Sequence, residues 1–172
     1  KNHGYNYRRG QDGHSFACLK KYTPEGSGVA GYPIFVDPVP FFAKRKVYIS
    51  NETAHPFYDN YYKTVAHRVK VSFKAHYAKD LRDMAKVLKG ENIDYFVFER
   101  RRFYPDALKK TSYFAPFDKL AKELTRGSYK RYAYRQLPEK VDPEKHPYMA
   151  FKDAKSVVID VNKLKERYLP NG

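Results

Sequence analysis

Side chains that could bind an anion follow three short apolar runs of the chain. Asp37 follows the first run, Glu52 and His55 follow the second, and an arginine triplet follows the third. Each arginine offers a planar fork of donors that matches the oxygens of a phosphate group. We therefore expect a site for an anionic sugar or a phosphate, formed by Asp37, Asn51, Glu52, His55, Arg100, Arg101 and Arg102.

Two other interpretations of these residues are open. In a purely structural one, Asp37 caps a helix that begins at Pro38, Glu52 pairs with a nearby arginine, and the arginine triplet is solvated. In a catalytic one, Glu52 and His55 act as acid and base of a hydrolase or transferase. Only their closeness in sequence suggests that pair, and proton transfer needs a bound substrate or a third group in reach.

The common catalytic and nucleotide-binding motifs are absent from the sequence. It contains no G-x-x-x-x-G-K-[ST], no G-x-G-x-x-G after the first apolar run, no G-x-S-x-G and no H-E-x-x-H. Cys18 is the single cysteine, so neither an intramolecular disulfide nor a thiolate zinc site can form. His67 and His76 lie nine positions apart, on opposite faces of one predicted helix. We expect no catalytic residue, no metal and no cofactor.

The elements that position these residues are predicted from apolar periodicity. Six residues indicate one long helix that begins near residue 56: Tyr58, Tyr62, Val65, Val69, Phe73 and Tyr77. Strands are predicted over residues 28–32, 46–50, 93–98, 129–134 and 156–161. Further helices are predicted over residues 38–43, 81–88 and 116–124, with helical turns at residue 105 and over 163–168.

This order of elements predicts a small Rossmann-like α/β fold, with a mostly parallel sheet and helices on both faces. Residues 1–16 are rich in glycine, asparagine and arginine and are expected to be a flexible linker, and residues 17–172 a single domain. In such a sheet, ligands bind beyond the carboxyl ends of the strands, near the point where the strand order reverses. The predicted site residues therefore share one rim if their three strands are parallel neighbours.

The chain is strongly basic. It has 34 Lys and Arg against 19 Asp and Glu, a formal charge of +15 that favours anionic partners without choosing among them. Rings and cations alternate over residues 129–135, which suits nucleic-acid binding but equally an amphipathic edge strand. The longest apolar stretch, residues 29–43, is interrupted by prolines and Asp37, and no segment is apolar enough to span a bilayer.

Between Cys18 and about Tyr104, the sequence resembles a domain of bacterial, notably cyanobacterial, multi-spanning membrane proteins related to GT-C glycosyltransferases. The resemblance rests on Gly31-Tyr32-Pro33, Asp37, Pro40-Phe41-Phe42, Arg45-Lys46-Val47, Ser50, Glu52, Pro56, Tyr61-Tyr62, Arg68, Ala75-His76-Tyr77 and Ile93-Asp94-Tyr95-Phe96-Val97. It covers about half of the chain, and after Tyr104 only Val157 to Asp160 match.

The resemblance implies a C-terminal domain on the extracytoplasmic, periplasmic side of a bacterial membrane. Its partner would be the integral-membrane portion of the parent protein, which would hold the catalytic carboxylates and bind a lipid-linked sugar. This chain would then be a non-catalytic piece of a larger glycosyltransferase-like protein, in contact with an anionic glycan or a lipid-linked phosphate. The alternative is a basic interaction protein that binds nucleic acid or serves as a subunit of a larger assembly; binding with a steep salt dependence would distinguish it.

Overall fold

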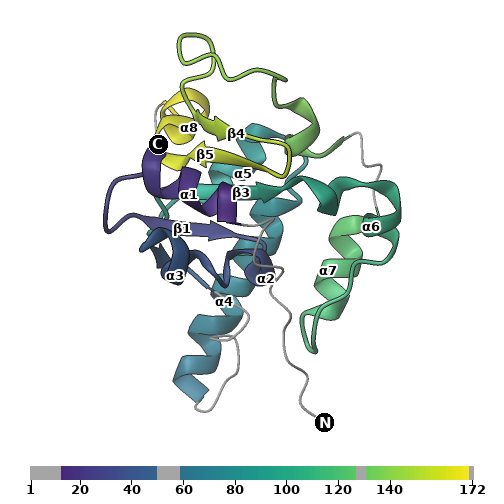
Figure 1. The fold of residues 1–172 in the computed structure, drawn as a ribbon. Helices are drawn as coiled ribbons and strands as arrows, with labels where there is room; N and C mark the ends of the chain where they lie inside the picture. The colour runs from purple at the N-terminus through teal and green to yellow at the C-terminus, as the bar shows by residue number, and fades with distance from the viewer. Residues whose placement is uncertain (1–12, 50–58, 127–130, 171–172) are drawn as a thin grey trace.

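The computed structural model describes residues 13–49, 59–126 and 131–170, and the structural statements below concern those residues. They form one five-stranded sheet with the strand order β2-β1-β3-β5-β4, and helices pack around it (Figure 1). In Figure 1, α1 lies in front of the sheet, whereas α4 and α5 pass behind it. The predicted small α/β class, with helices on both faces of a sheet, is confirmed.

Four of the five strands point the same way. β1 pairs in parallel with β2 and β3, and β5 is antiparallel to both of its neighbours, β3 and β4. The strands are β1 (Gly28–Gly31), β2 (Lys46–Val47), β3 (Tyr95–Glu99), β4 (Met149–Lys152) and β5 (Ser156–Asp160). The sheet is therefore parallel around β1, where both strand pairings are parallel. Both pairings of β5 are antiparallel, and β4 and β5 form a hairpin.

The helices fall between and after these strands. They are α1 (Gly13–Tyr22), α2 (Pro33–Val36), α3 (Val39–Ala43), α4 (Asp59–His76), α5 (Leu81–Val87), α6 (Pro105–Lys109), α7 (Asp118–Thr125) and α8 (Val161–Tyr168), with 3-10 turns η2 (Arg100–Phe103) and η4 (Ala133–Gln136). The apolar stripe of α4 buries Val65, Val69 and Phe73, as predicted. No helix of the described residues is both long and apolar enough to cross a bilayer.

The strand order reverses at β1. The chain leaves β1 through α2 and α3 to reach β2 on one side, and then crosses through α4 and α5 to β3 on the other side. Two neighbouring parallel strands with opposite crossover directions leave a crevice beyond their carboxyl ends. The residues that follow β1 and β3 are consequently the ones that the fold brings to this rim.

Several predicted elements differ from the structure. The strand predicted over residues 129–134 is wrong over its described part, since Ala133 begins a 3-10 turn and its N–H donates to the Ala78 carbonyl at 2.7 Å. The edge strand is β4 instead. The second strand is shorter than predicted: β2 ends at Val47. Helix α1 includes the last residues of the predicted linker and buries Phe16; residues 1–12 lie outside the described part.

Asp37 does not cap the helix that follows it. It is the C-terminal cap of α2, in right-handed helical conformation, and the N-terminal cap of α3 is Pro38, without a side-chain hydrogen bond. The chain makes two short helices here, because the first helix already begins at Pro33. Asp37 is thereby half-buried beside the rim.

Candidate functional site

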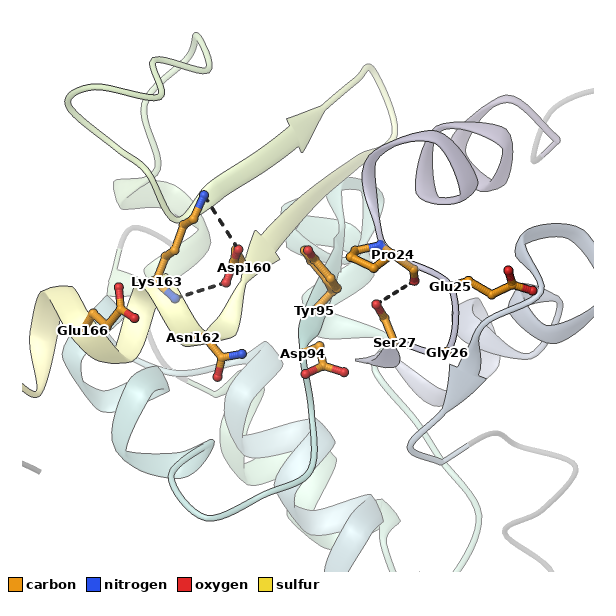
Figure 2. A pocket seen from close by; sticks show the side chains of 10 residues that line it. All are labelled: Pro24, Glu25, Gly26, Ser27, Asp94, Tyr95, Asp160, Asn162, Lys163 and Glu166. Atoms are coloured by element: carbon orange, nitrogen blue, oxygen red, sulfur yellow. Dashed lines mark hydrogen bonds and ion pairs between the residues drawn. The ribbon is translucent and has the colours of Figure 1, made fainter.

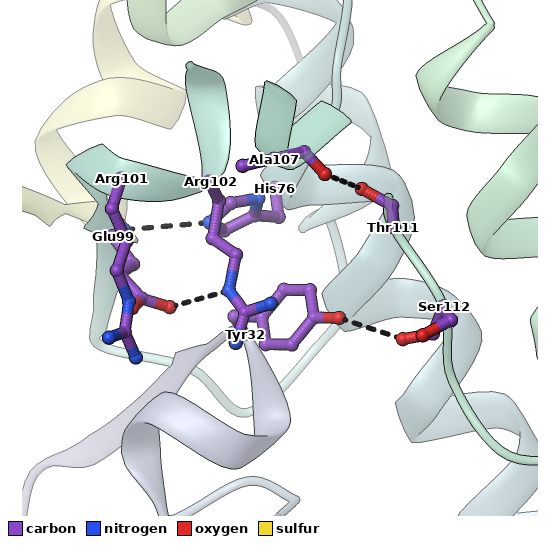
Figure 3. A network of polar contacts seen from close by, with 8 residues as sticks. All are labelled: Tyr32, His76, Glu99, Arg101, Arg102, Ala107, Thr111 and Ser112. Atoms are coloured by element: carbon purple, nitrogen blue, oxygen red, sulfur yellow. Dashed lines mark hydrogen bonds and ion pairs between the residues drawn. The ribbon is translucent and has the colours of Figure 1, made fainter. Parts of the chain in front are cut away.

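The rim between β1 and β3 is organised by Glu99, the last residue of β3 (Figure 3). Its side chain is 2% exposed and accepts from Arg102 Nε at 2.8 Å and from Arg101 Nε. Both arginines belong to η2, which starts directly after the strand, so one carboxylate orients two neighbouring guanidinium groups. Such charge-assisted bonds are about twice as strong as neutral ones.

Arg102 lies over the ring of Tyr32, the first residue after β1. Its guanidinium carbon is 3.9 Å from the ring centroid, which is cation–π geometry. Burial lowers the pKa of Arg102, but Glu99 outweighs it and holds that pKa above its ordinary value. The side chain is only 23% exposed. The solvated interpretation of the arginine triplet is therefore wrong for Arg102, which joins the two strand ends.

His76, the last residue of α4, packs against Glu99 and Tyr32 at the rim. It is fully buried, its Nε2 accepts from the Glu99 N–H at 3.5 Å, and its ring stacks on Phe103 at 4.8 Å. Because Nε2 accepts, the ring proton lies on Nδ1, for which the described residues offer no hydrogen-bond partner. Burial, helped by the charge of Arg102, lowers the pKa of His76 well below its ordinary value, so the imidazole is neutral.

Asp37 lies on the same rim, beyond Tyr113. The Tyr113 ring is edge-on to Tyr32, with centroids 6.4 Å apart. Burial raises the pKa of Tyr113, and the negative charge of Asp37 raises it further, which places Asp37 near the phenol.

The structure brings together part of the predicted set. Arg101 and Arg102 are both held by Glu99 at the rim and Asp37 lies directly after α2, whereas Asn51, Glu52 and His55 lie outside the described residues. Arg100 is exposed, and its backbone N–H donates to Lys155 at the β4–β5 turn. The predicted ligand-binding set lacks Glu99, Tyr32 and His76, although Tyr32 and Glu99 lie at the ends of predicted strands and so on the predicted rim. Tyr32 and His76 both fall in motifs of the resemblance, which is the signal that could have identified them.

The rim can hold an anion. Residues 99–102 carry three guanidinium groups and one carboxylate, and the side chain of Arg101 is 71% exposed although its Nε is bound to Glu99. The buried imidazole is neutral, and burial raises the pKa of Tyr32, so these two groups bring no negative charge to repel a ligand. Among the described residues, no three His, Cys, Asp or Glu side chains are grouped to hold a metal ion.

The two described rings of the predicted nucleic-acid segment, Tyr132 and Tyr134, are packed against the protein. Tyr132 is buried and donates its hydroxyl to the Leu124 carbonyl at 3.0 Å. Tyr134 stacks on Phe103 with centroids 4.2 Å apart. The buried Tyr132 ring cannot offer a face to a nucleic-acid base in this conformation, and Phe103 covers one face of the half-buried Tyr134 ring; Arg131 and Arg135 beside them are exposed.

A second hollow of about 500 Å³ lies at the opposite end of β1 and β3 (Figure 2). It is lined by the carboxylates of Glu25, Asp94, Asp160 and Glu166 and by Lys163, among others. Asp94 accepts from the Gly28 N–H at 2.7 Å, and Asp160 accepts from the Lys163 N–H at the start of α8. These two carboxylates hold strand and helix ends together, and we assign them a structural role.

No protein-family model matches the sequence, and no curated protein matches it. Among solved structures, the fold is similar to the C-terminal globular domain of an oligosaccharyltransferase from Archaeoglobus fulgidus. The likeness covers 87% of this chain and 96% of that chain, with a TM-score of 0.48 and 10% sequence identity. At that level, it carries no conclusion about activity.

Proposed function

We propose that this chain is a non-catalytic, extracytoplasmic domain of a GT-C-like membrane glycosyltransferase and that its rim contacts an anionic glycan or a lipid-linked phosphate. The proposed binding rests on one observation. The buried carboxylate of Glu99 orients Arg101 and Arg102 at the point where the strand order reverses. Arg102 is held inside this arrangement, and a ligand can reach the exposed guanidinium groups of Arg101 and of its neighbour Arg100.

The placement beside a membrane portion rests on the sequence resemblance. Two of its motifs contribute to the rim: Gly31-Tyr32-Pro33 supplies the ring beneath Arg102, and Ala75-His76-Tyr77 supplies the imidazole that packs edge-on against that ring. A domain of this kind contributes a surface for the acceptor and leaves the chemistry to the membrane portion. We therefore expect no turnover of a sugar donor by this chain alone.

Binding to the rim can be tested with a galacturonic acid trimer, an anionic glycan, in calorimetric titrations. The variant Arg100→Ala/Arg101→Ala should bind about tenfold more weakly or worse, since one hydrogen bond to a charged group contributes about 1.5–3 kcal/mol. The control Arg82→Ala/Lys86→Ala removes the same charge from exposed positions of α5 and should bind like the wild type.

Two outcomes would contradict the proposal. Equal weakening in both variants would mean that the trimer senses only net charge. Unchanged affinity in the rim variant, with folding intact, would mean that these arginines do not bind the glycan. A DNA oligonucleotide that binds more tightly than the trimer, with a steep salt dependence, would instead support the basic interaction protein.

A further inference from the structure

A separate cavity lies between α6 and α7, and none of its lining residues is one of those assigned to the rim. It measures about 690 Å³, within the range of small-molecule sites. The residues that matter for its chemistry are Leu108, Lys109, Thr111, Lys122, Thr125 and Arg126. The first three come from α6 and the turn after it, and the others from α7 and its C-terminal cap.

The charged residues that line this cavity are all cationic. Lys109, Lys122 and Arg126 face it, and no carboxylate is among the lining residues. Asp118 approaches one of these cations, with its Oδ2 at 3.7 Å from Lys122 Nζ; the Lys122 side chain remains 55% exposed. The cavity is thus a cation-lined hollow that is suited to an anion, and a phosphate can bind several ammonium and guanidinium donors at once.

The two threonines restrict what else can bind. Thr111 Oγ1 donates to the Ala107 carbonyl at 3.0 Å (Figure 3), and Thr125 Oγ1 donates to the Ala121 carbonyl at 2.9 Å. Each hydroxyl has one hydrogen, and both hydrogens are already used. Thr111 is buried and its side chain also interacts with Tyr77, so the acceptor that a ligand can reach is the oxygen of the half-buried Thr125. The group that suits this oxygen on a ligand is a hydroxyl donor. The buried Leu108 adds an apolar wall.

We propose that this cavity binds a small phosphorylated polyol, the class that includes the sugar phosphates. The three cations bind the phosphate, and the Thr125 oxygen accepts from a hydroxyl group of the ligand. A bare phosphate would leave the Thr125 oxygen unused, and an uncharged sugar would leave the cations without an anion. This assignment does not rest on the function proposed for the rim.

The test is an NMR titration of the labelled chain with glucose 6-phosphate, inorganic phosphate and glucose. Glucose 6-phosphate should bind about tenfold more tightly than phosphate, and glucose more weakly still, because only the first ligand satisfies both sets of groups. The amide signals of Leu108 and Thr125 should shift, and those of Arg101 and Arg102 should not. Equal affinity for phosphate and glucose 6-phosphate, or shifts confined to the rim, would overturn the proposal.

Three variants separate this cavity from the rim and from net charge. Lys109→Ala/Lys122→Ala/Arg126→Ala should lose glucose 6-phosphate binding by at least tenfold, whereas Arg82→Ala/Lys86→Ala/Lys89→Ala, which removes the same charge from exposed positions, should retain it. Arg100→Ala/Arg101→Ala should also retain it, which keeps this proposal distinct from the rim proposal. Thr125→Val should reduce the preference for glucose 6-phosphate over phosphate; an unchanged preference would contradict the role of the hydroxyl.

Discussion

Glu99 is a buried carboxylate whose two ion-pair partners are both arginines of the next turn. Replacing it by glutamine leaves Arg102 largely buried without a counter-charge. We expect Glu99→Gln to lower the free energy of unfolding by about 3 kcal/mol, the lower end for breaking a buried pair, since Arg102 keeps some solvent contact. Urea unfolding measures this. Arg101→Ala, whose side chain is mostly exposed, should cost less than about 1 kcal/mol, and similar losses in the two variants would contradict this account.

One buried residue, His76, makes the free energy of unfolding depend on pH. Burial, and then the charge of Arg102, lowers its pKa in the folded state, whereas the unfolded chain protonates it near pH 6.5. Stability is therefore full above pH 6.5 and is lost as the pH falls below it. Between pH 7.5 and 5.5, this histidine should account for a loss of about 1.4 kcal/mol in the free energy of unfolding.

The loss attributed to His76 is obtained by comparing variants in urea unfolding at the two pH values. His76→Phe should show a smaller loss than the wild type by this amount, because other titrating groups cancel in the comparison. His67→Ala alters an exposed histidine of the same helix. This variant should keep the whole loss in the free energy of unfolding that His76 causes. An identical pH dependence in the wild type and His76→Phe would show that the buried imidazole does not resist protonation.

At the scale of elements, Gly31 sets how closely β1 approaches β3 and α2. A Cβ at this position would lie 2.7 Å from the Val97 carbonyl oxygen and 2.9 Å from a Val36 methyl group. Since backbone stands in the way, Gly31→Ala should lower the free energy of unfolding by about 3 kcal/mol, the upper part of the range for overpacking.

The control for Gly31 is Gly90, which has φ of +79° and open space around a Cβ. Gly90→Ala therefore meets only the conformational cost of a left-handed residue, about 1–2 kcal/mol. Thermal or urea unfolding of both variants should rank Gly31→Ala as the more damaging. The reverse order would mean that the strand moves to accommodate the methyl group.

Elements with strong periodicity or clear turn residues could be predicted from the sequence, and weakly patterned ones could not. The stripe of α4 and the apolar run of β5 are local patterns that their partners in the fold reinforce. Alternation of rings and cations over residues 129–134 resembled a strand, yet Tyr132 is held by packing and a hydrogen bond to Leu124. β4 has three half-buried residues and follows a charged loop, so its strand character comes from pairing with β5.

At the scale of the whole molecule, a formal charge of +15 opposes folding through self-repulsion. Salt screens this repulsion, so raising NaCl from 0.02 M to 0.3 M should stabilise the protein by about 1 kcal/mol, or about 2–4 °C in Tm. The variant Lys74→Glu/Lys86→Glu/Lys89→Glu lowers the charge by two per substitution, from +15 to +9, and should show a smaller rise. A Tm that falls with salt would indicate that surface ion pairs outweigh the repulsion.

The sequence by itself determined the alternation of strands and helices, the long amphipathic α4 and the loops that carry Asp37 and the arginines. These features depend on periodicity and turn residues, which are properties of neighbouring positions. Only the tertiary structure decided that β5 runs against β3, that Arg102 covers Tyr32 and that His76 is buried below Glu99. Those outcomes depend on pairing and packing between residues dozens of positions apart, and no local pattern specifies which distant group a strand or a side chain will meet.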